Sequence, residues 1–263
     1  MRIASWNVNS LRTRLEHLST WLGQNPVDAL CLQETKVVDE DFPRAALESL
    51  GYHCAFVGQK SYNGVAILSR QPLEDVRLGF GGVLPAATIG DLDDQKRVIS
   101  GVLCGVRLVN LYVPNGSSPD SDKYSYKLRW LTLLRQYLTA LQDEAAPVSV
   151  CGDFNIALED RDIYAPGKDD HIMATPMERQ ALRDNVLSLG FHDAFRLFSD
   201  AEDAFSWWDY RQAGFQRNRG WRIDHHYVSK PLRERAIACI IDREPRSWEK
   251  PSDHAPVLLE LAD

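Results

Sequence analysis

Polar and acidic residues stand at the ends of several apolar runs: Asn7, Glu34, Asp153, Asn155, Asp224, Asp253 and His254. Because sites in α/β proteins gather at strand ends, where loops converge, we expect these side chains to lie together. Four of them are carboxylates, which repel one another when they are close, and a bound hard cation removes that repulsion. Mg²⁺ is the natural choice, since it takes few carboxylates, keeps several waters and bridges to phosphate oxygens.

The segment Gly152-Asp153-Phe154-Asn155 carries two of these groups two residues apart. In an extended chain both side chains point the same way, which suits two groups acting on one water molecule or one phosphate. A histidine beside an aspartate, as at Asp253-His254, can hold or polarise a phosphate, particularly as an imidazolium paired with Asp224.

Each motif also has an ordinary structural interpretation when it is taken alone. Gly-Asp-Phe-Asn makes a good turn, and Ser-Asp-His suits a helix cap or a turn. Tyr112 alone is most often a core aromatic residue, and His225 and His226 are interpreted as structural or surface residues. The functional interpretation is favoured because all the motifs occur together, in order, at the ends of predicted strands.

Short apolar runs alternate with helical patterns along the whole chain. Residues 2–8 alternate as a strand does, and Ser10 is placed to cap a helix that runs to about Gln24. Residues 123–141 form the clearest amphipathic helix, and residues 175–187 open with Thr-Pro, a common cap and first-turn pair. Further strands are expected at 28–33, 65–69, 98–104, 106–113, 148–154, 223–228, 236–241 and 255–261. The pattern predicts one α/β domain over residues 1–263.

The net charge of −7 argues against indiscriminate coating of nucleic acid, because phosphate binding rests on excess Lys and Arg. Residues 205–223 are an exception, with four arginines against one aspartate and several interleaved aromatic rings. Such a stretch predicts a local DNA-facing surface. Its members are Trp207, Trp208, Asp209, Tyr210, Arg211, Phe215, Arg217, Arg219, Trp221 and Arg222.

No apolar segment reaches membrane-spanning length, and the chain starts with a strand-like run rather than a signal peptide. We therefore expect a cytoplasmic protein with no membrane partner. The five cysteines include no CxxC pair, which argues against zinc. Cys31, Cys104, Cys151 and Cys239 lie in apolar runs and are interpreted as core residues.

The ordered motifs resemble those of the exonuclease III-type AP endonucleases, in the endonuclease/exonuclease/phosphatase superfamily, over essentially the whole chain. The resemblance implies a four-layered α/β sandwich with two central mixed β-sheets flanked by helices. It implies a monomeric enzyme that acts on double-stranded DNA with abasic or 3′-blocked damage, by metal-assisted in-line attack of water on phosphorus. The motifs are Trp-Asn-Val-Asn at 6–9, Gln-Glu-Thr-Lys at 33–36, Asn-Leu-Tyr-Val-Pro-Asn-Gly at 110–116, Gly-Asp-Phe-Asn at 152–155, Gly-Trp-Arg-Ile-Asp at 220–224 and Ser-Asp-His-Ala-Pro at 252–256.

The resemblance assigns roles to these residues motif by motif. Glu34 resembles the main metal-ligating carboxylate, with Asn7 and Asp253 beside it, for Mg²⁺ or Mn²⁺ as a substitute. Asp153 resembles the residue that orients or deprotonates the attacking water, and Asn155 supports it.

The substrate-facing residues follow in the same way. His254, paired with Asp224, resembles the histidine that contacts the phosphate. Tyr112 resembles the active-site tyrosine near the scissile phosphate, and Asn115 resembles a further phosphate contact.

Trp207, Trp221 and Ile223 match the family's apolar pocket for a base-less sugar, although on composition alone the two tryptophans also suit a core. An abasic nucleotide has little stacking to lose, so it flips out easily, and a small pocket excludes a normal base. Met173 lies within residues 164–177, where family members vary. We hypothesise that this bulky residue narrows the pocket and favours 3′-end cleaning over abasic-site incision.

Several alternatives stay open at this point. The residues do not distinguish abasic incision, 3′-phosphodiesterase, 3′-phosphatase and 3′→5′ exonuclease activity, one metal from two, or DNA from an RNA–DNA hybrid. Phosphoinositide phosphatases, sphingomyelinases and secreted deoxyribonucleases share the superfamily, but the tryptophan-rich stretch favours DNA repair. A catalytically inactive DNA-binding module is disfavoured because Glu34, Asp153 and His254 are all present.

Overall fold

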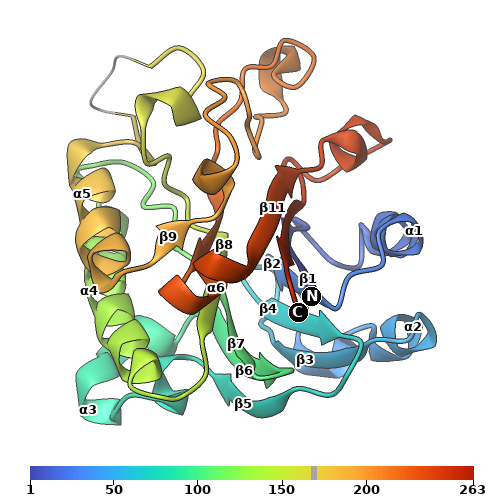
Figure 1. The fold of residues 1–263 in the computed structure, drawn as a ribbon. Helices are drawn as coiled ribbons and strands as arrows, with labels where there is room; N and C mark the ends of the chain where they lie inside the picture. Colours follow the sequence, from blue (N-terminus) through green and yellow to red (C-terminus); the bar gives the residue numbers. More distant parts are fainter. Residues whose placement is uncertain (167–170) are drawn as a thin grey trace.

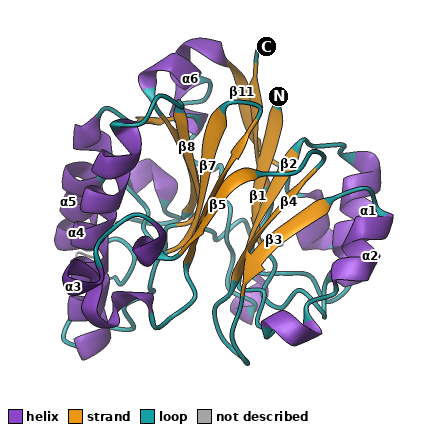
Figure 2. Ribbon diagram, turned by 90° about the horizontal axis from the view of Figure 1, so that it is seen from below, coloured by secondary structure: helices purple, strands orange, loops and turns teal. Residues whose placement is uncertain are grey.

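Two six-stranded sheets pack face to face in the computed structural model, which describes residues 1–166 and 171–263. Helices cover the outer face of each sheet, so that the protein has four layers (Figures 1 and 2). The four-layered α/β sandwich expected from the resemblance is thus confirmed. The two chain ends lie side by side (Figure 1), and the Met1 amino group donates to the Leu261 carbonyl at 2.7 Å.

Each sheet contains one parallel strand pair among antiparallel neighbours. The parallel pairs are β1 with β2 in the first sheet and β7 with β8 in the second. The first sheet has the order β11-β12-β1-β2-β4-β3, from β1 (Arg2–Asn7), β2 (Ala29–Gln33), β3 (His53–Val57), β4 (Val65–Ser69), β11 (Ala236–Ile241) and β12 (Val257–Leu261). The second has the order β5-β6-β7-β8-β10-β9, from β5 (Glu74–Leu78), β6 (Val98–Leu103), β7 (Val106–Tyr112), β8 (Val148–Asp153), β9 (His192–Asp193) and β10 (Asp224–Val228).

The helices divide between the two outer layers. Helices α1 (Leu15–Gln24) and α2 (Arg44–Ser49) cover the first sheet, and α3 (Ala86–Ile89), α4 (Asp122–Gln142) and α5 (Pro176–Asn185) cover the second (Figure 2). The short α6 (Lys230–Arg235) follows β10. No helix in the described parts of the chain has the length and apolarity needed to cross a membrane.

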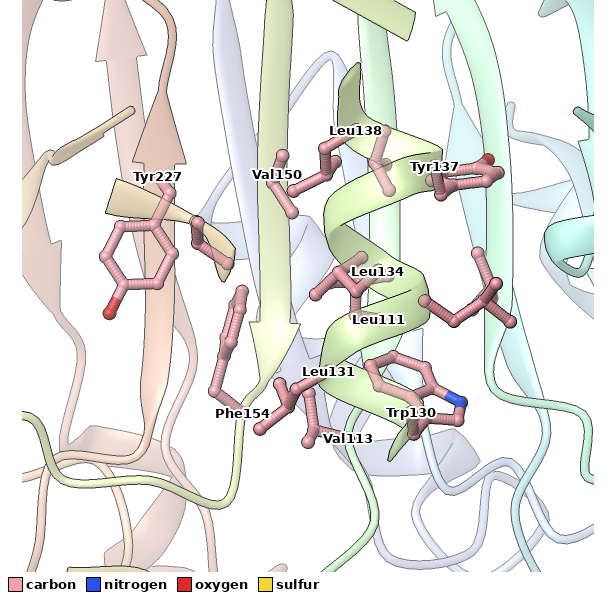
Figure 3. Packing of buried hydrophobic residues seen from close by; sticks show 14 of the residues in the cluster. Leu111, Val113, Trp130, Leu131, Leu134, Tyr137, Leu138, Val150, Phe154 and Tyr227 are labelled. Atoms are coloured by element: carbon pink, nitrogen blue, oxygen red, sulfur yellow. The ribbon is translucent and has the colours of Figure 1, made fainter. Parts of the chain in front are cut away.

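Three apolar clusters fill the three spaces between the four layers. The middle cluster, between the sheets, includes Ile3, Cys31, Leu108 and Cys151. The cluster beneath α4 is shown in Figure 3, where leucines of the helix lie against β7 and β8. Leu131, Leu134, Leu138, Leu111 and Val150 are all buried there.

The predicted strands lie where the structure has them, within about two residues at each end, and 65–69 and 236–241 agree at both ends. Three edge strands, β3, β5 and β9, went unpredicted, since the mostly exposed β5 shows no alternation of apolar and polar residues and β9 has only two residues. The helix start at Ser10 is wrong, because Asn9 and Ser10 have φ values of 43° and 93° and α1 begins at Leu15. The core position of Cys104 is also wrong: it is exposed in the turn between β6 and β7.

A buried polar contact joins the two sheets beneath their carboxyl-terminal ends. Asn110 of β7 donates through Nδ2 to the carbonyls of Leu32 at 2.9 Å and Ala66 at 2.8 Å in the opposite sheet. Its Oδ1 accepts from Gln33 Nε2 at 2.7 Å. These bonds fix the position of one sheet against the other, since a shift would leave buried polar groups unpaired.

We predict that Asn110→Ala lowers the free energy of unfolding by about 2–4 kcal/mol, because it leaves the Gln33 amide without this acceptor and adds a small cavity. Urea denaturation monitored by tryptophan fluorescence would measure this change. Gln136→Ala, on the exposed face of α4, is the control and should change it by no more than about 0.5 kcal/mol. Equal effects of the two substitutions would contradict the sheet-joining role.

Candidate active site

Side chains from both sheets meet at the ends of the two parallel strand pairs. Asn7 ends β1, Glu34 directly follows β2, and Asp153 ends β8 in the opposite sheet. Asn7 Nδ2 donates to Glu34 Oε1 at 2.8 Å and to Asp153 Oδ2 at 2.9 Å. One amide group therefore holds a carboxylate from each sheet, and the structure brings these three predicted residues together.

A tight turn after β2 aims the Glu34 side chain into this site. Glu34 and Lys36 have φ values of 52° and 53°, in the left-handed region. The Thr35 amide donates to the Gly64 carbonyl at 3.2 Å. Gly64 has a φ of 89°, and a Cβ there would lie 2.1 Å from Thr35 Oγ1, so a side chain does not fit. The turn also brings Lys36 Nζ to 2.8 Å from Glu34 Oε2.

His254 lies opposite these carboxylates and forms a buried ion pair with Asp224 of β10. Its Nδ1 is 2.9 Å from Asp224 Oδ2, and its Nε2 is 3.7 Å from Asp153 Oδ2. Ser206 Oγ donates to Asp224 Oδ2 at 2.6 Å and fixes that carboxylate. Burial alone lowers the pKa of His254, but the charges of Asp224 and Asp153 outweigh burial and raise the pKa to about 10. The imidazole is therefore a cation at neutral pH.

Asp153 is buried next to other acidic groups. Burial, together with the Asp224 and Glu34 carboxylates, raises the pKa of Asp153 to about 7, although His254 acts in the opposite direction. The extended geometry expected for Asp153 and Asn155 is wrong, since β8 ends at Asp153 and Asn155 has a φ of 48°. The turn still joins them, because the backbone N–H of Asn155 donates to Asp153 Oδ1 at 2.8 Å.

The acidic groups lie close enough together to share a cation. One ligand atom each of Glu34, Asp153 and His254 lies within 4.8 Å of the others. Burial, and to a lesser degree the Asp224 and Glu34 carboxylates, raises the pKa of Asp153, and Lys36 places a positive charge beside Glu34. The oxygens of Glu34 and Asp153 fit a hard divalent ion, whereas the protonated His254 does not bind a metal.

The structure does not bring Asp253 into that group of ligand atoms. Its Oδ1 accepts from Asn9 Nδ2 at 2.9 Å and its Oδ2 from Trp207 Nε1 at 3.0 Å. Burial disfavours its charge, but His254 and the Trp207 hydrogen bond lower the pKa of Asp253 overall. Asp253 and His254 precede the final strand and do not open it, because β12 begins at Val257.

Tyr112 and Asn115 lie on the second-sheet side of the site. Tyr112 is paired in register with Asp153 across the parallel strands. The Arg97 guanidinium lies 4.5 Å from the centre of the Tyr112 ring, and Nη1 donates to the Tyr112 carbonyl at 3.1 Å. Asn115 Nδ2 donates to Asn155 Oδ1 at 3.1 Å. Burial and the nearby carboxylates raise the pKa of Tyr112 well above its usual value, so that the phenol keeps its proton.

The residues predicted for the sugar pocket do form one apolar cluster. Trp207 and Trp221 lie edge to face with ring centres 6.4 Å apart, and Ile223 is buried beside them. Met173 belongs to the same cluster and is 7% exposed. Part of the predicted variable segment, residues 167–170, lies outside the described residues.

The basic and aromatic stretch 205–223 is only partly a surface. Arg211 and Tyr210 are exposed, as a DNA-facing surface requires. Trp208 is buried, and Arg222 is buried between two carboxylates, with Nε 2.7 Å from Asp162 and Nη2 2.7 Å from Asp193. For Trp208 and Arg222 the predicted surface position is therefore wrong, because both support the loop from within.

Comparison with known proteins places this arrangement in a family. Residues 4–254 match the endonuclease/exonuclease/phosphatase family. This chain belongs to that family. This chain is 38% identical to exodeoxyribonuclease III of Haemophilus influenzae over an alignment of 277 residues, which covers 99% of this chain and 100% of that protein. It is 32% identical to the DNA repair nuclease APEX1 of Danio rerio, over 100% of this chain and 82% of that protein.

Two solved structures are similar to this chain in both fold and sequence. The structure of the 3′ phosphatase NExo from Neisseria, bound to a product DNA hairpin, is 42% identical with a TM-score of 0.93 and full coverage of both chains (100%). An AP endonuclease from Archaeoglobus fulgidus is 39% identical with a TM-score of 0.93 and covers 99% of each chain. The resemblance to exonuclease III-type enzymes is confirmed.

Sequence reasoning missed four residues that support the site of this family member. Lys36 contacts Glu34, Arg97 stacks on Tyr112, Ser206 fixes Asp224, and Lys127 is buried below the loops. Two of them carried a signal in the sequence. Lys36 belongs to the Gln-Glu-Thr-Lys motif, and Lys127 interrupts the apolar face of the predicted helix 123–141.

We predict that Asp224→Asn lowers the pKa of His254, because it removes the main charge that raises it. In metal-free wild-type protein His254 stays protonated up to pH values near its pKa of about 10, whereas the variant loses the proton at lower pH. NMR titration of the histidine side chains would measure both. His226, whose pKa burial lowers to about 4, is the internal control and stays neutral from pH 6 upwards. An unchanged His254 titration would contradict the ion pair.

Proposed function

We propose that this chain is a Mg²⁺-dependent DNA-repair phosphodiesterase that hydrolyses the backbone at abasic sites and removes 3′-blocking groups. The observation that carries this proposal is the buried His254–Asp224 ion pair, whose free ring nitrogen faces Asp153 at 3.7 Å. A fixed cation facing a carboxylate of raised pKa suits hydrolysis of an anionic phosphate ester. The relatives named exodeoxyribonuclease III and DNA repair nuclease support the same class of substrate.

The chain's own residues divide the work of this hydrolysis. His254 donates from Nε2 to a phosphate oxygen, and its charge stabilises the negative charge that builds up during attack. Asp153 accepts a proton from the attacking water or orients that water, with its carboxylate fixed by Asn155 and Asn7. Tyr112, which keeps its proton, donates to the phosphate, and Asn115 adds an amide contact.

A divalent metal supplies charge stabilisation for the phosphate and for the leaving oxygen when it is bound. Glu34 would hold it, with Asn7 and Asp153 beside it, whereas the Asp253 oxygens are bonded to Asn9 and Trp207, and Lys36 would have to move away from Glu34 Oε2. We favour Mg²⁺ because the available ligands are mostly oxygens, and Mn²⁺ is expected to substitute for it.

The surface beside the site has room and charge for a DNA strand. An open cavity of about 610 Å³ begins at Tyr112 and Asn115 and is lined by three cationic residues, Arg97, Lys123 and Arg129, and by two acidic ones, Asp91 and Asp122, so that its charged lining is positive by one. Arginine and lysine side chains along such a path suit backbone phosphates. Double-stranded DNA is accordingly the proposed partner.

We predict Mg²⁺-dependent release of the 3′-phosphate from a nicked duplex and cutting of a duplex with an internal abasic-site analogue. EDTA should abolish both reactions, and Asp153→Asn should reduce them at least about 100-fold, since it removes the proton acceptor. Labelled duplexes resolved on denaturing gels provide the measurement, and Gln136→Ala is the control for handling and folding. A folded wild-type protein that cleaves neither duplex would overturn the proposal and direct attention to other phosphate esters.

A narrower proposal is that 3′-end cleaning predominates over abasic-site incision. Met173 has a φ of 72°, an unfavourable conformation for a side chain, and yet lies among the apolar pocket residues with 7% exposure. Its side chain packs against these residues, so in this proposal it competes with a flipped sugar for the same space. The 3′ phosphatase from Neisseria, at 42% identity, supports this specialisation, whereas the archaeal AP endonuclease at 39% identity leaves incision open.

We predict that Met173→Gly raises incision at an internal abasic site by about 10-fold or more relative to 3′-phosphate removal, because it opens space for the sugar. Glycine also accepts a positive φ without strain, so the fold should tolerate the change. Rates on the two duplexes, measured side by side, give the ratio. Met177→Gly, at an exposed position of α5, is the control and should leave the ratio unchanged. No change of the ratio in Met173→Gly would reject the narrower proposal.

Three further expectations from the sequence stay predictions. They are a single domain over residues 1–263, a monomeric state and a cytoplasmic location.

A further inference from the structure

A lysine of α4 is completely buried next to the site. Lys127 and Glu178 each have 0% exposed side chains, and their charged atoms are 2.5 Å apart. Lys127 Nζ also donates to the carbonyls of Asn115 at 3.1 Å and Asn155 at 2.8 Å. An ammonium group has three donors, and here each of them has an acceptor. Asn115 and Asn155 are the two amide residues of the proposed phosphate site, so Lys127 joins both of their loops.

Glu178 does more than begin α5. A capping box with Thr175 uses Oε2, which accepts from the Thr175 amide at 3.0 Å. The other oxygen, Oε1, accepts from Lys127 and from the Met173 amide at 3.1 Å. A capping box alone does not need these two contacts. They attach the loop that carries Met173 to the same ion pair.

The three loops are packed closely around this pair. Gly116 follows Asn115 with a φ of 94°, and a Cβ there would lie 3.2 Å from Lys127 Cδ and 3.1 Å from Ile172 Cδ1. The Ala157 amide donates to the Met173 carbonyl at 2.7 Å. A displacement of the Met173 loop therefore reaches both asparagine loops, because all of them contact the same ion pair or one another.

We propose that the Lys127–Glu178 pair is a positioning element that sets the Asn115 and Asn155 loops and the Met173 pocket loop relative to one another. This inference rests on the proposed function of the site. A buried ion pair contributes little to stability compared with well-packed apolar residues, so its three-way contacts fit positioning better than stabilisation. The pair makes the alignment of the phosphate depend on the state of the pocket loop.

The test uses the charge-neutral double variant Lys127→Met with Glu178→Gln, which leaves no bare charge in the interior. On the 3′-phosphate duplex we expect kcat to fall about 10–100-fold, because misplacement by about 1 Å has effects of that size. KM and the anisotropy-measured affinity for a 3′-phosphate hairpin in EDTA should change by less than about 3-fold. The ratio of abasic-site incision to 3′-phosphate removal should rise, because Met173 loses its restraint.

Arg107→Met is the matched control. Arg107 lies on the same strand as Tyr112 but at its far end, where it is buried beside Glu144 at 3.1 Å. It should lower stability without changing kcat, KM or the ratio. If the double variant does not fold, Glu178→Asp keeps both charges and shortens the carboxylate, and it should show the same pattern with a loss of about 3–10-fold.

The outcomes separate this inference from the proposed function. A wild-type protein that cleaves neither duplex refutes the function itself. An active wild type with variants whose kcat and ratio match those of Arg107→Met refutes the positioning role, as does a loss confined to KM. A fall in kcat at constant affinity, with a higher ratio, supports it.

Discussion

The structure depends on holding carboxylates from two different sheets close together in a buried place. Asn7 achieves this with a single amide, which donates to Glu34 from the first sheet and to Asp153 from the second. The inner faces of β1 and β7 make this contact possible, because both become more polar towards the carboxyl end of the strand. In β1 the inner residues run from Ile3 through Ser5 to Asn7, and β7 runs from Leu108 through Asn110 to Tyr112. An apolar interface at one end holds the sheets together, so that the other end can carry charge.

Crowded negative charge must be balanced where it is needed for chemistry. His254 supplies one fixed cation, and Asp224 on its far side keeps it protonated at neutral pH. Burial and the neighbouring carboxylates still raise the pKa of Asp153 to about 7, and a bound divalent ion would lower that pKa and favour the charged carboxylate. Lys36 beside Glu34 occupies part of the position where a second positive charge is favourable. The protonation of Asp153 therefore depends on whether a divalent ion is bound.

The sequence allowed the fold and most of the site to be predicted, because strand alternation and strand-end polar residues are local signals. Asn7, Glu34 and Asp153 were found in this way and lie together as expected. The turn at Asn9 and Ser10 was not found, because its positive φ values follow from contacts with the Glu34–Thr35 turn, which is distant in sequence. The inward position of Arg222 was hidden for a similar reason, since its two aspartate partners lie in other segments. Local sequence patterns indicate which face of a strand is apolar, but they do not indicate which charged residues from distant segments form ion pairs.

Specificity in such a site need not come from the residues that carry out the hydrolysis. Most of the proposed catalytic groups lie at or next to strand ends that the two sheets hold fixed, whereas Met173 lies in a loop with a strained backbone of φ 72°. That loop is attached to the rest through Glu178 and the Ala157 amide, and through Lys127 to the asparagine loops. A change of the pocket side chain can therefore alter which DNA lesion fits without altering the chemistry. The contacts between the Met173 loop and the asparagine loops would still make the alignment of the phosphate depend on which lesion is bound.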